Sequence, residues 1–287
     1  MKSARLVLSA MVTLSAVALA AQISEGDAQW TLRAEGHVGP RARTVRVDAA
    51  IDAYRNAIAA SPSDLEAHWK LMRAIRFKGA YAASSDDERK RIYDEARSAG
   101  NDAMALVDRA LAAKGIKSPS RAAEKEVAAA ARSIAGAGEI YYWDAVNWGE
   151  WALVFGKLAA VRQGAADRIR RHSTIAMLID PRLEGGGGAQ VLGRLHHQTP
   201  RVPLLTGWAS NALAVRYLRE AAAAEPSNKI TQVFLAEAMV ANDPARRPEA
   251  IRILRSVIAA PADPAFAVEH EAARADARLL LRQWGID

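Results

Sequence analysis

The histidines, which are the residues best suited to bind a metal ion, do not have the spacing of a metal site. His196 and His197 are adjacent, so on a helix they point to different sides and cannot readily bind the same metal ion. His270 lies between Glu269 and Glu271, in a pattern typical of a solvated helix face. The sequence has neither an HExxH motif nor any cysteine, the two most recognisable sources of zinc ligands. We therefore predict no metal site.

Catalytic combinations are also missing from the sequence. Ser210 has no nucleophile-elbow context, and no Ser/His/Asp order fits a triad. Asp86 and Asp87 are placed where a helix is expected to start, and acidic side chains stabilise the helix dipole there. We predict that the protein is not an enzyme and holds no cofactor. Convergence of Asp144, Glu150 and a histidine in one cleft would revive an enzymatic interpretation.

An aromatic segment spans residues 139–156, EIYYWDAVNWGEWALVFG. Its apolar residues lie on nearly all sides of a helix, as expected for a helix buried in a large core or facing a cavity. One interpretation is a central core helix whose polar residues bond to neighbouring turns. The other is the wall of an apolar ligand cleft. In that case the ligand-binding residues are Tyr141, Trp143, Trp148 and Trp151.

A glycine-rich segment covers residues 180–200, DPRLEGGGGAQVLGRLHHQTP. Backbone N–H groups at the start of the helix after the glycines could hold an anion, with Arg182 or Arg194 as the opposite charge. No Gly-Lys-Ser/Thr follows, so a phosphate-binding loop is not supported. The alternative is a flexible or sharply turning connection between two helices.

A short repeated phrase indicates how the helices that carry these residues are connected. It reads AIAASP at 57–62, AMLIDP at 176–181 and AAAAEP at 221–226, with a weaker copy, SVIAAP, at 256–261. Each copy ends a stretch of helical periodicity. Proline stops a helix, and Ser63/Asp64 or Ser227/Asn228 can cap the next one. The pattern predicts helix, proline-containing turn and helix, as in tetratricopeptide repeats.

The fold class follows from this pattern and from composition. The 287 residues are rich in alanine and lack the alternating runs typical of strands. We predict an all-α, divergent tetratricopeptide-like helical-hairpin array in a single domain over residues 43–287. Residues 21–42 contain several glycines and a proline and are expected to form an irregular N-terminal arm. Helices are expected near 43–60, 64–79, 86–113, 119–136, 139–162, 165–179, 188–198, 209–224, 228–241, 247–259 and 264–284.

The first twenty residues have the three parts of a secretory signal peptide. Lys2 and Arg5 precede an apolar run, and Ala18-Leu19-Ala20 forms a small-x-small cleavage signal. We predict a signal peptide over 1–20 and a periplasmic mature protein with no membrane span; the alternative is an uncleaved anchor. The chain has no lipidation cysteine. The net charge is +7, but the basic residues are interspersed with acidic ones and form no basic stripe. We therefore expect no nucleic-acid partner.

Several segments resemble one family. YYWDAVNWGEWA resembles the aromatic helix of T-component proteins of tripartite ATP-independent periplasmic (TRAP) transporters, and GGGGAQVLGRLHHQTP resembles their glycine-led segment. AIDAYRNAIAASPSDLEAHWKLMRAIRFKG and DDERKRIYDEARSAGNDAMAL are similar to their N-terminal half. The resemblance covers about residues 47–245.

The resemblance implies a non-catalytic periplasmic accessory protein. Such a protein would bind the transporter's substrate-binding subunit and a small organic-acid or apolar ligand, and could self-associate. By position, Gly186, Gly187 and Arg194 would join the aromatic residues in the ligand site. Ala189 and Gln190 stand where relatives have a G-P-x-R pattern, which leaves Arg194 as the arginine for an anion. The alternative is a generic helical scaffold for protein–protein interaction in the cell envelope.

Overall fold

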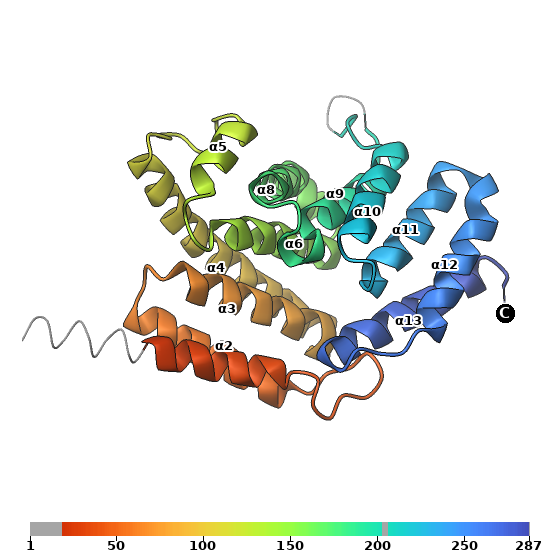
Figure 1. The fold of residues 1–287 in the computed structure, drawn as a ribbon, viewed down its shortest axis with the longest axis horizontal. Helices are drawn as coiled ribbons and strands as arrows, with labels where there is room; N and C mark the ends of the chain where they lie inside the picture. Colours follow the sequence, from red (N-terminus) through yellow and green to blue (C-terminus); the bar gives the residue numbers. More distant parts are fainter. Residues whose placement is uncertain (1–18, 203–205, 287) are drawn as a thin grey trace, which may run out of the picture.

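The computed structural model describes residues 19–202 and 206–286, and this part of the chain is all-α (Figure 1). It contains no β-strand, and its one isolated bridge joins Val38 to Arg41. The predicted fold class is confirmed: the helices form a single compact array in which neighbours in sequence are neighbours in space.

The α-helices follow one another with short connections. They are α2 (Thr44–Ala60), α3 (Leu65–Phe77), α4 (Asp86–Ala113), α5 (Glu124–Ala131), α6 (Ala137–Phe155), α7 (Lys157–Arg162), α8 (Ala165–Ile179), α9 (Gly187–Gln198), α10 (Asn211–Ala224), α11 (Lys229–Asn242), α12 (Arg247–Ala259) and α13 (Ala267–Gln283). A π-helical turn, Lys78–Ala82, extends α3. Three 3-10 turns lie at Leu183–Gly185, Pro244–Arg246 and Pro264–Phe266.

The proline-containing turns connect the helices as the repeat predicts. Pro62, Pro181 and Pro226 each come two residues after the last residue of a helix, namely α2, α8 and α10. The Asp64 side chain accepts a hydrogen bond from the backbone N–H of Ala67 and so caps α3. Asn228 caps α11 in the same way. These caps satisfy amide donors that a helix start leaves unpaired.

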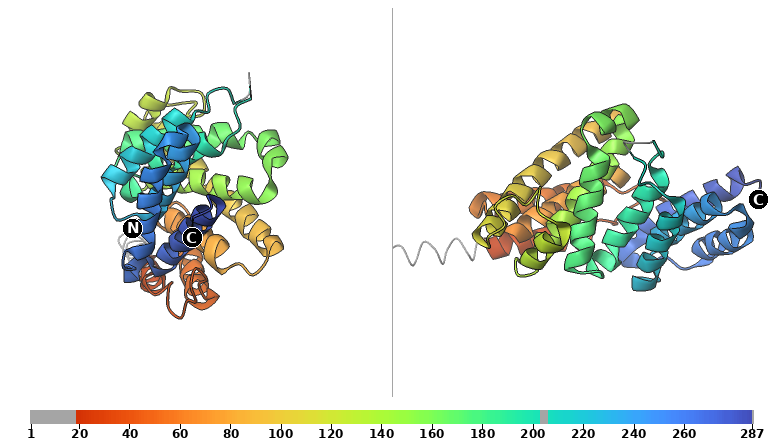
Figure 2. Two further views of the ribbon diagram at one scale, coloured as in Figure 1. Left: turned by 90° about the vertical axis from the view of Figure 1, so that its right-hand side faces the viewer. Right: turned by 90° about the horizontal axis from the view of Figure 1, so that it is seen from above.

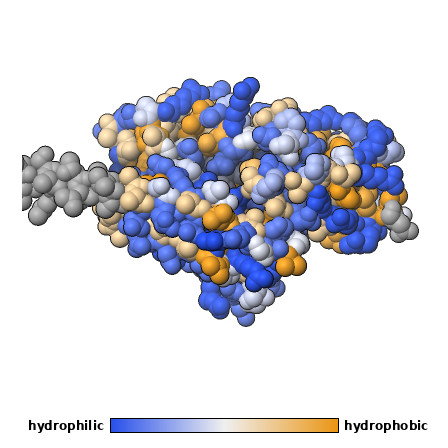
Figure 3. Space-filling view, turned by 60° about the horizontal axis from the view of Figure 1, so that its bottom comes forward, coloured by the Kyte–Doolittle hydropathy of each residue, from blue (hydrophilic) through white to orange (hydrophobic). Residues whose placement is uncertain are grey.

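The aromatic helix α6 lies at the centre of the array (Figure 1). It packs against α3, α4 and α8 and also contacts α9. Its tyrosines and tryptophans divide between the two largest core clusters, one centred on α2–α4 and the other on α4, α5 and α8. The further views in Figure 2 show the later helices, α10 to α13, continuing away from this centre. The face in Figure 3 is mostly hydrophilic, with hydrophobic residues in small groups.

The irregular arm expected over residues 21–42 is wrong for its first half, because residues 19–31 form a helix. Gly26 suggested a break in the pattern. In the structure a Cβ at Gly26 would lie 2.4 Å from the Tyr54 ring, so this glycine lets the helix approach α2 closely. Asp27, one residue later, accepts a hydrogen bond from the Tyr54 hydroxyl at 2.8 Å. Residues 37–43, in contrast, are not helical, as expected for an irregular arm.

The segment that follows helix 19–31 contacts the C-terminal part of the described chain. Arg33 forms an ion pair with Glu269 of α13 at 2.9 Å and donates a hydrogen bond to the carbonyl of Ala265. The beginning of α13 therefore lies beside the N-terminal segment (Figure 1). The expected signal peptide falls outside the described residues, apart from Leu19 and Ala20.

Two helix boundaries differ from the expectation. The helix expected over 139–162 is divided at Gly156, where φ is +86°, into α6 and α7. A left-handed backbone angle favours glycine and ends an α-helix. The helix expected over 119–136 is shorter, Glu124–Ala131.

Candidate ligand site

Asp144, one of three polar groups in the later part of α6, is held by two side chains of α8. Its carboxylate accepts hydrogen bonds from Arg168 at 2.7 and 2.9 Å and lies 2.7 Å from Nδ1 of His172. Gly100 of α4 makes room for it, since a Cβ there would lie 2.7 Å from Oδ1. Burial alone would raise the pKa of Asp144, but His172 and Arg168 outweigh it and lower the pKa. The charge is therefore structural and fully paired.

The other two polar groups of α6 bond to α3. The Asn147 side chain donates to the backbone carbonyl of Met72 at 3.2 Å, and Glu150 forms an ion pair with Arg76 at 2.6 Å. Asp144 thus faces α8 whereas Glu150 faces α3. The carboxylates and a histidine, whose convergence would indicate an enzyme, do not meet in one cleft.

Trp148 and Trp151 pack against an arginine of α4. The Arg97 guanidinium lies 4.2 Å from each of the two ring centroids. The Trp151 Nε1–H donates to Asp94 at 2.8 Å, and its ring stacks on Phe155 at 4.6 Å. Both indoles are only 4% exposed. Both residues are therefore part of the hydrophobic core. Their ligand role stays a prediction.

Tyr141 and Arg194 lie on different elements and have partners of their own. The Tyr141 ring meets the edge of His172, with ring centroids 5.1 Å apart. Arg194 of α9 forms an ion pair with Glu237 of α11 and lies 4.2 Å above the Phe234 ring. The structure therefore does not bring the predicted ligand residues together around a single ligand.

The glycines at the start of α9 are required for close packing. Gly186 has a φ of +82°, and a Cβ there would lie 2.8 Å from the Cβ of Ala224. At Gly187 a Cβ would lie 2.4 Å from the Tyr142 ring. Both glycines are buried. The segment is a sharp turn between helices, as the alternative interpretation held, and the anion role of these amides stays a prediction.

Trp143 leads to a different site. Its Nε1–H donates to Glu184 at 3.2 Å. Glu184 is the one non-glycine residue with positive φ (+49°) among the described residues. Such strain is often retained at binding sites. The protein around it raises the pKa of Glu184 by desolvation, although the residue is exposed to solvent.

Near Glu184, arginines and aromatic rings alternate. The Arg73 guanidinium lies 4.9 Å from the Trp69 ring centroid and 4.2 Å from that of Trp30. The Arg33 guanidinium also lies close to Trp30, at 4.5 Å from its ring centroid. It is 5.5 Å from the ring centroid of Phe266. We call the four residues Trp69, Arg73, Trp30 and Arg33 the arginine–indole stack. It joins helix 19–31 to α3, and cation–π attraction holds its members together.

The two arginines of the stack differ in their partners. Arg33 is neutralised by Glu269. Arg73 forms no ion pair within the part of the chain that the structure describes, and its Nε is buried without a hydrogen-bond partner. Burial lowers the pKa of Arg73, while its interaction with the Tyr54 side chain and the charge of Glu184 oppose the shift. Arg73 is therefore a desolvated cation with donors to spare, and a guanidinium binds a carboxylate with two parallel hydrogen bonds.

We call Trp30, Trp69, Arg73, Trp143 and Glu184 the Arg73 site. Only Trp143 was selected from the sequence. The signal for the rest was present in part, since Trp69 and Arg73 are four residues apart on one face of α3. Trp30 lies in a segment that was expected to be irregular, and Glu184 has no pattern of its own beside the four glycines that follow it.

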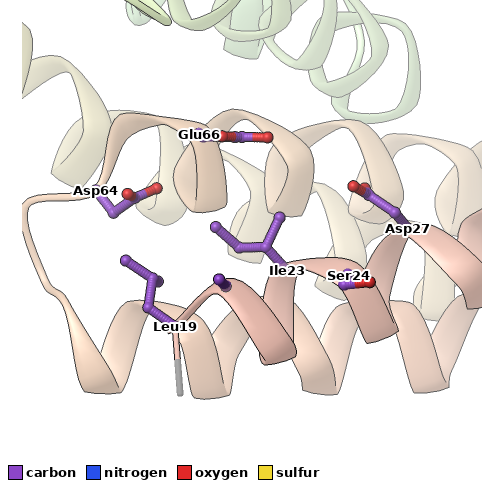
Figure 4. A pocket seen from close by; sticks show the side chains of 7 residues that line it. Leu19, Ile23, Ser24, Asp27, Asp64 and Glu66 are labelled. Atoms are coloured by element: carbon purple, nitrogen blue, oxygen red, sulfur yellow. The ribbon is translucent and has the colours of Figure 1, made fainter. Parts of the chain in front are cut away.

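A shallow hollow lies near the stack, between helix 19–31 and the start of α3. Its volume is about 390 Å³. Leu19 and Ile23 point into it, with carboxylates opposite and at one end (Figure 4). The lining consists of Leu19, Ala20, Ile23, Ser24, Asp27, Asp64 and Glu66. Lys70 bonds to both Asp27 and Glu66 at 2.6 Å, so part of the acidic charge is neutralised.

Comparison with known proteins assigns no function to the chain: no family model matches it, and no curated protein matches it. None of the helices in residues 19–202 and 206–286 is long and apolar enough to cross a membrane. The same residues contain no group of three metal-ligating His, Cys, Asp or Glu side chains.

Proposed function

We propose that the protein is a non-catalytic periplasmic accessory protein of a TRAP-type solute transporter. In this proposal it binds a small organic acid at the Arg73 site and associates with the substrate-binding subunit. The observation that carries the ligand role is Arg73, a half-buried guanidinium that lies close to two indoles and forms no ion pair with any described residue. An unpaired buried charge is costly, and an anionic ligand would remove that cost.

The chemistry of the site favours a particular class of ligand. Arg73 would bind the carboxylate, and the faces of Trp30 and Trp69 would cover a flat or apolar body. Glu184, with its exposed carboxyl, would disfavour a second negative charge close to Trp143. A monocarboxylate with an aromatic or aliphatic body therefore fits better than a dicarboxylate.

The transport association rests on the resemblance over residues 47–245 and on the leader-like residues 1–20. The helical-hairpin array supports it, because stacked hairpins offer large surfaces to other proteins.

A second candidate is a generic scaffold for protein–protein interaction. The open hollow beside Asp27, Asp64 and Glu66 favours it, since such a surface suits a basic peptide segment. Trp148 and Trp151 were expected to decide between the two by facing a pocket or a groove. They lie in the core instead and favour neither.

Thermal unfolding with a panel of small carboxylates tests the ligand role. A ligand at about one hundred times its Kd stabilises the folded protein by about 2.7 kcal/mol, which raises Tm by roughly 5 °C or more in a protein of this size. Arg73→Gln should abolish the shift. Arg216→Gln is the matched control, because Arg216 also lies over an aromatic ring, Tyr217, but on the exposed face of α10.

The absence of any shift across aromatic and aliphatic monocarboxylates would contradict the ligand role, as would an equal loss in Arg73→Gln and Arg216→Gln. Co-purification with the substrate-binding subunit tests the partner separately. Association without a ligand shift would leave the scaffold as the better account.

A further inference from the structure

The short helix α7 has its large and small residues on unexpected sides. Leu158 and Val161 are 64% and 62% exposed, whereas Ala159 and Ala160 pack against the core cluster. None of the residues of α7 is buried. A helix that only covered a core would turn its leucine and valine inward. The outward position of the larger side chains therefore needs another explanation.

The charges of α7 are arranged around these two residues. At 100° per residue, Ala159 and Ala160 point inward, and Leu158 and Val161 lie within about 60° of each other on the opposite side. Lys157 and Arg162 fall on the two edges of that outward face, about 70° from its centre on either side. An aliphatic centre with a cation on each edge is typical of helices that lie on membrane surfaces.

The end of α6 adds a third exposed aliphatic residue close by in the sequence. Leu153 is 64% exposed and lies just before the turn at Gly156 that leads into α7. We call Leu153, Lys157, Leu158, Val161 and Arg162 the α7 corner. Its segment is at the edge of the molecule, in the green part of the ribbon in Figure 2.

The segment that forms this corner carries no acidic residue of its own. Residues 151–166 include no Asp or Glu. The flanking carboxylates are both paired, Glu150 with Arg76 and Asp167 with Arg170. Neither Lys157 nor Arg162 forms an ion pair among the residues that the structure describes.

We propose that the α7 corner docks on an anionic lipid surface, with Leu158 and Val161 entering the interface and Lys157 and Arg162 contacting lipid phosphates. A phosphate-bearing surface complements the unpaired cations, and each basic residue close to such a surface strengthens binding. A protein partner fits less well, because protein interfaces favour aromatic residues and disfavour lysine. This binding is peripheral and is independent of the ligand proposed at the Arg73 site.

Co-sedimentation of the full chain with vesicles tests this proposal. Vesicles of phosphatidylcholine with about one third phosphatidylglycerol should bind the protein, and pure phosphatidylcholine should bind it at least tenfold more weakly. Raising the salt concentration should weaken the binding because the attraction is screened. The double variant Leu158→Glu/Val161→Glu should lose about tenfold or more in partitioning.

Val45→Glu is the matched control, because Val45 of α2 is 70% exposed and lies outside the corner. It adds one acidic charge and should keep most of the binding. All variants share the same N-terminus, so any contribution of the leader-like residues is common to them. Circular dichroism checks that each variant is folded.

Three outcomes would overturn the proposal. One is equal binding to anionic and neutral vesicles. Another is equal loss of binding in the control and the double variant. The third is a wild-type dimer that the double variant dissociates, with no vesicle binding, which would assign the corner to a second copy of the chain.

Discussion

The contact between Gly187 and Tyr142 gives a prediction whose sign is fixed by the structure. Replacing Gly187 by alanine would put a Cβ 2.4 Å from one atom of the Tyr142 ring and 2.8 Å from another. Contacts this short require one group to move. Tyr142 is 7% exposed and its ring packs against Trp143 at 4.8 Å, so it has little room to do so.

Inserting a methyl group into a packed core costs about 1–3 kcal/mol, and the gain in helix propensity from glycine to alanine recovers roughly 0.5–1 kcal/mol. We expect Gly187→Ala to destabilise the protein by about 1–2 kcal/mol. Gly149→Ala in α6 is the matched control, because no atom lies within 4 Å of the added Cβ. That variant should be more stable than the wild type by about 0.5–1 kcal/mol.

Urea unfolding followed by circular dichroism measures both effects. The midpoints should move in opposite directions while the m-values stay the same, since neither variant changes the surface exposed on unfolding. A Gly187→Ala protein as stable as the wild type would refute the packing account of the glycine run, and the anion role of its amides would regain weight.

Two further predictions concern buried charges. Asp144→Ala should destabilise the protein by about 3 kcal/mol, because it removes the carboxylate that pairs with Arg168 and His172. Asp167→Ala, which breaks an exposed ion pair, should cost less than about 0.5 kcal/mol. Equal urea midpoints for the two variants would contradict this prediction. Burial of Glu237 would raise its pKa, but His197 and Arg194 lower the pKa to about 2. Its contribution, about 2 kcal/mol after allowance for solvent screening, is therefore complete above about pH 4.5 and lost as the pH falls towards 2, so the wild type and Glu237→Gln should differ at pH 7 and converge near pH 2. A constant difference between their unfolding free energies across that range would count against the assignment.

The sequence predicts the fold well because local signals and packing agree. Proline at 62, 181 and 226 and the capping side chains of Asp64 and Asn228 mark helix boundaries that depend on local interactions. The long periodic segments around them have one way to bury their apolar faces. Element type and approximate bounds follow from such signals.

The errors have a common physical cause. Gly26 and Gly187 look like breaks or loops in sequence, but each occupies a point where a tyrosine ring from another helix leaves no space for a side chain. A close approach of this kind depends on distant residues, and one sequence does not show them.

The site was only partly predictable for a related reason. Trp148 and Trp151 stand out by composition, but their contacts with Arg97 place them in the core. Arg73 stands out only when Trp30, over forty residues earlier, is found beside it.

A crystal structure of the protein with the carboxylate that stabilises it most tests the central claim directly. We predict that the carboxylate lies within hydrogen-bonding distance of the Arg73 guanidinium, with the body of the ligand against Trp30 or Trp69. A ligand bound beside Trp148 and Trp151, or at the start of α9, would contradict the assignment of the Arg73 site.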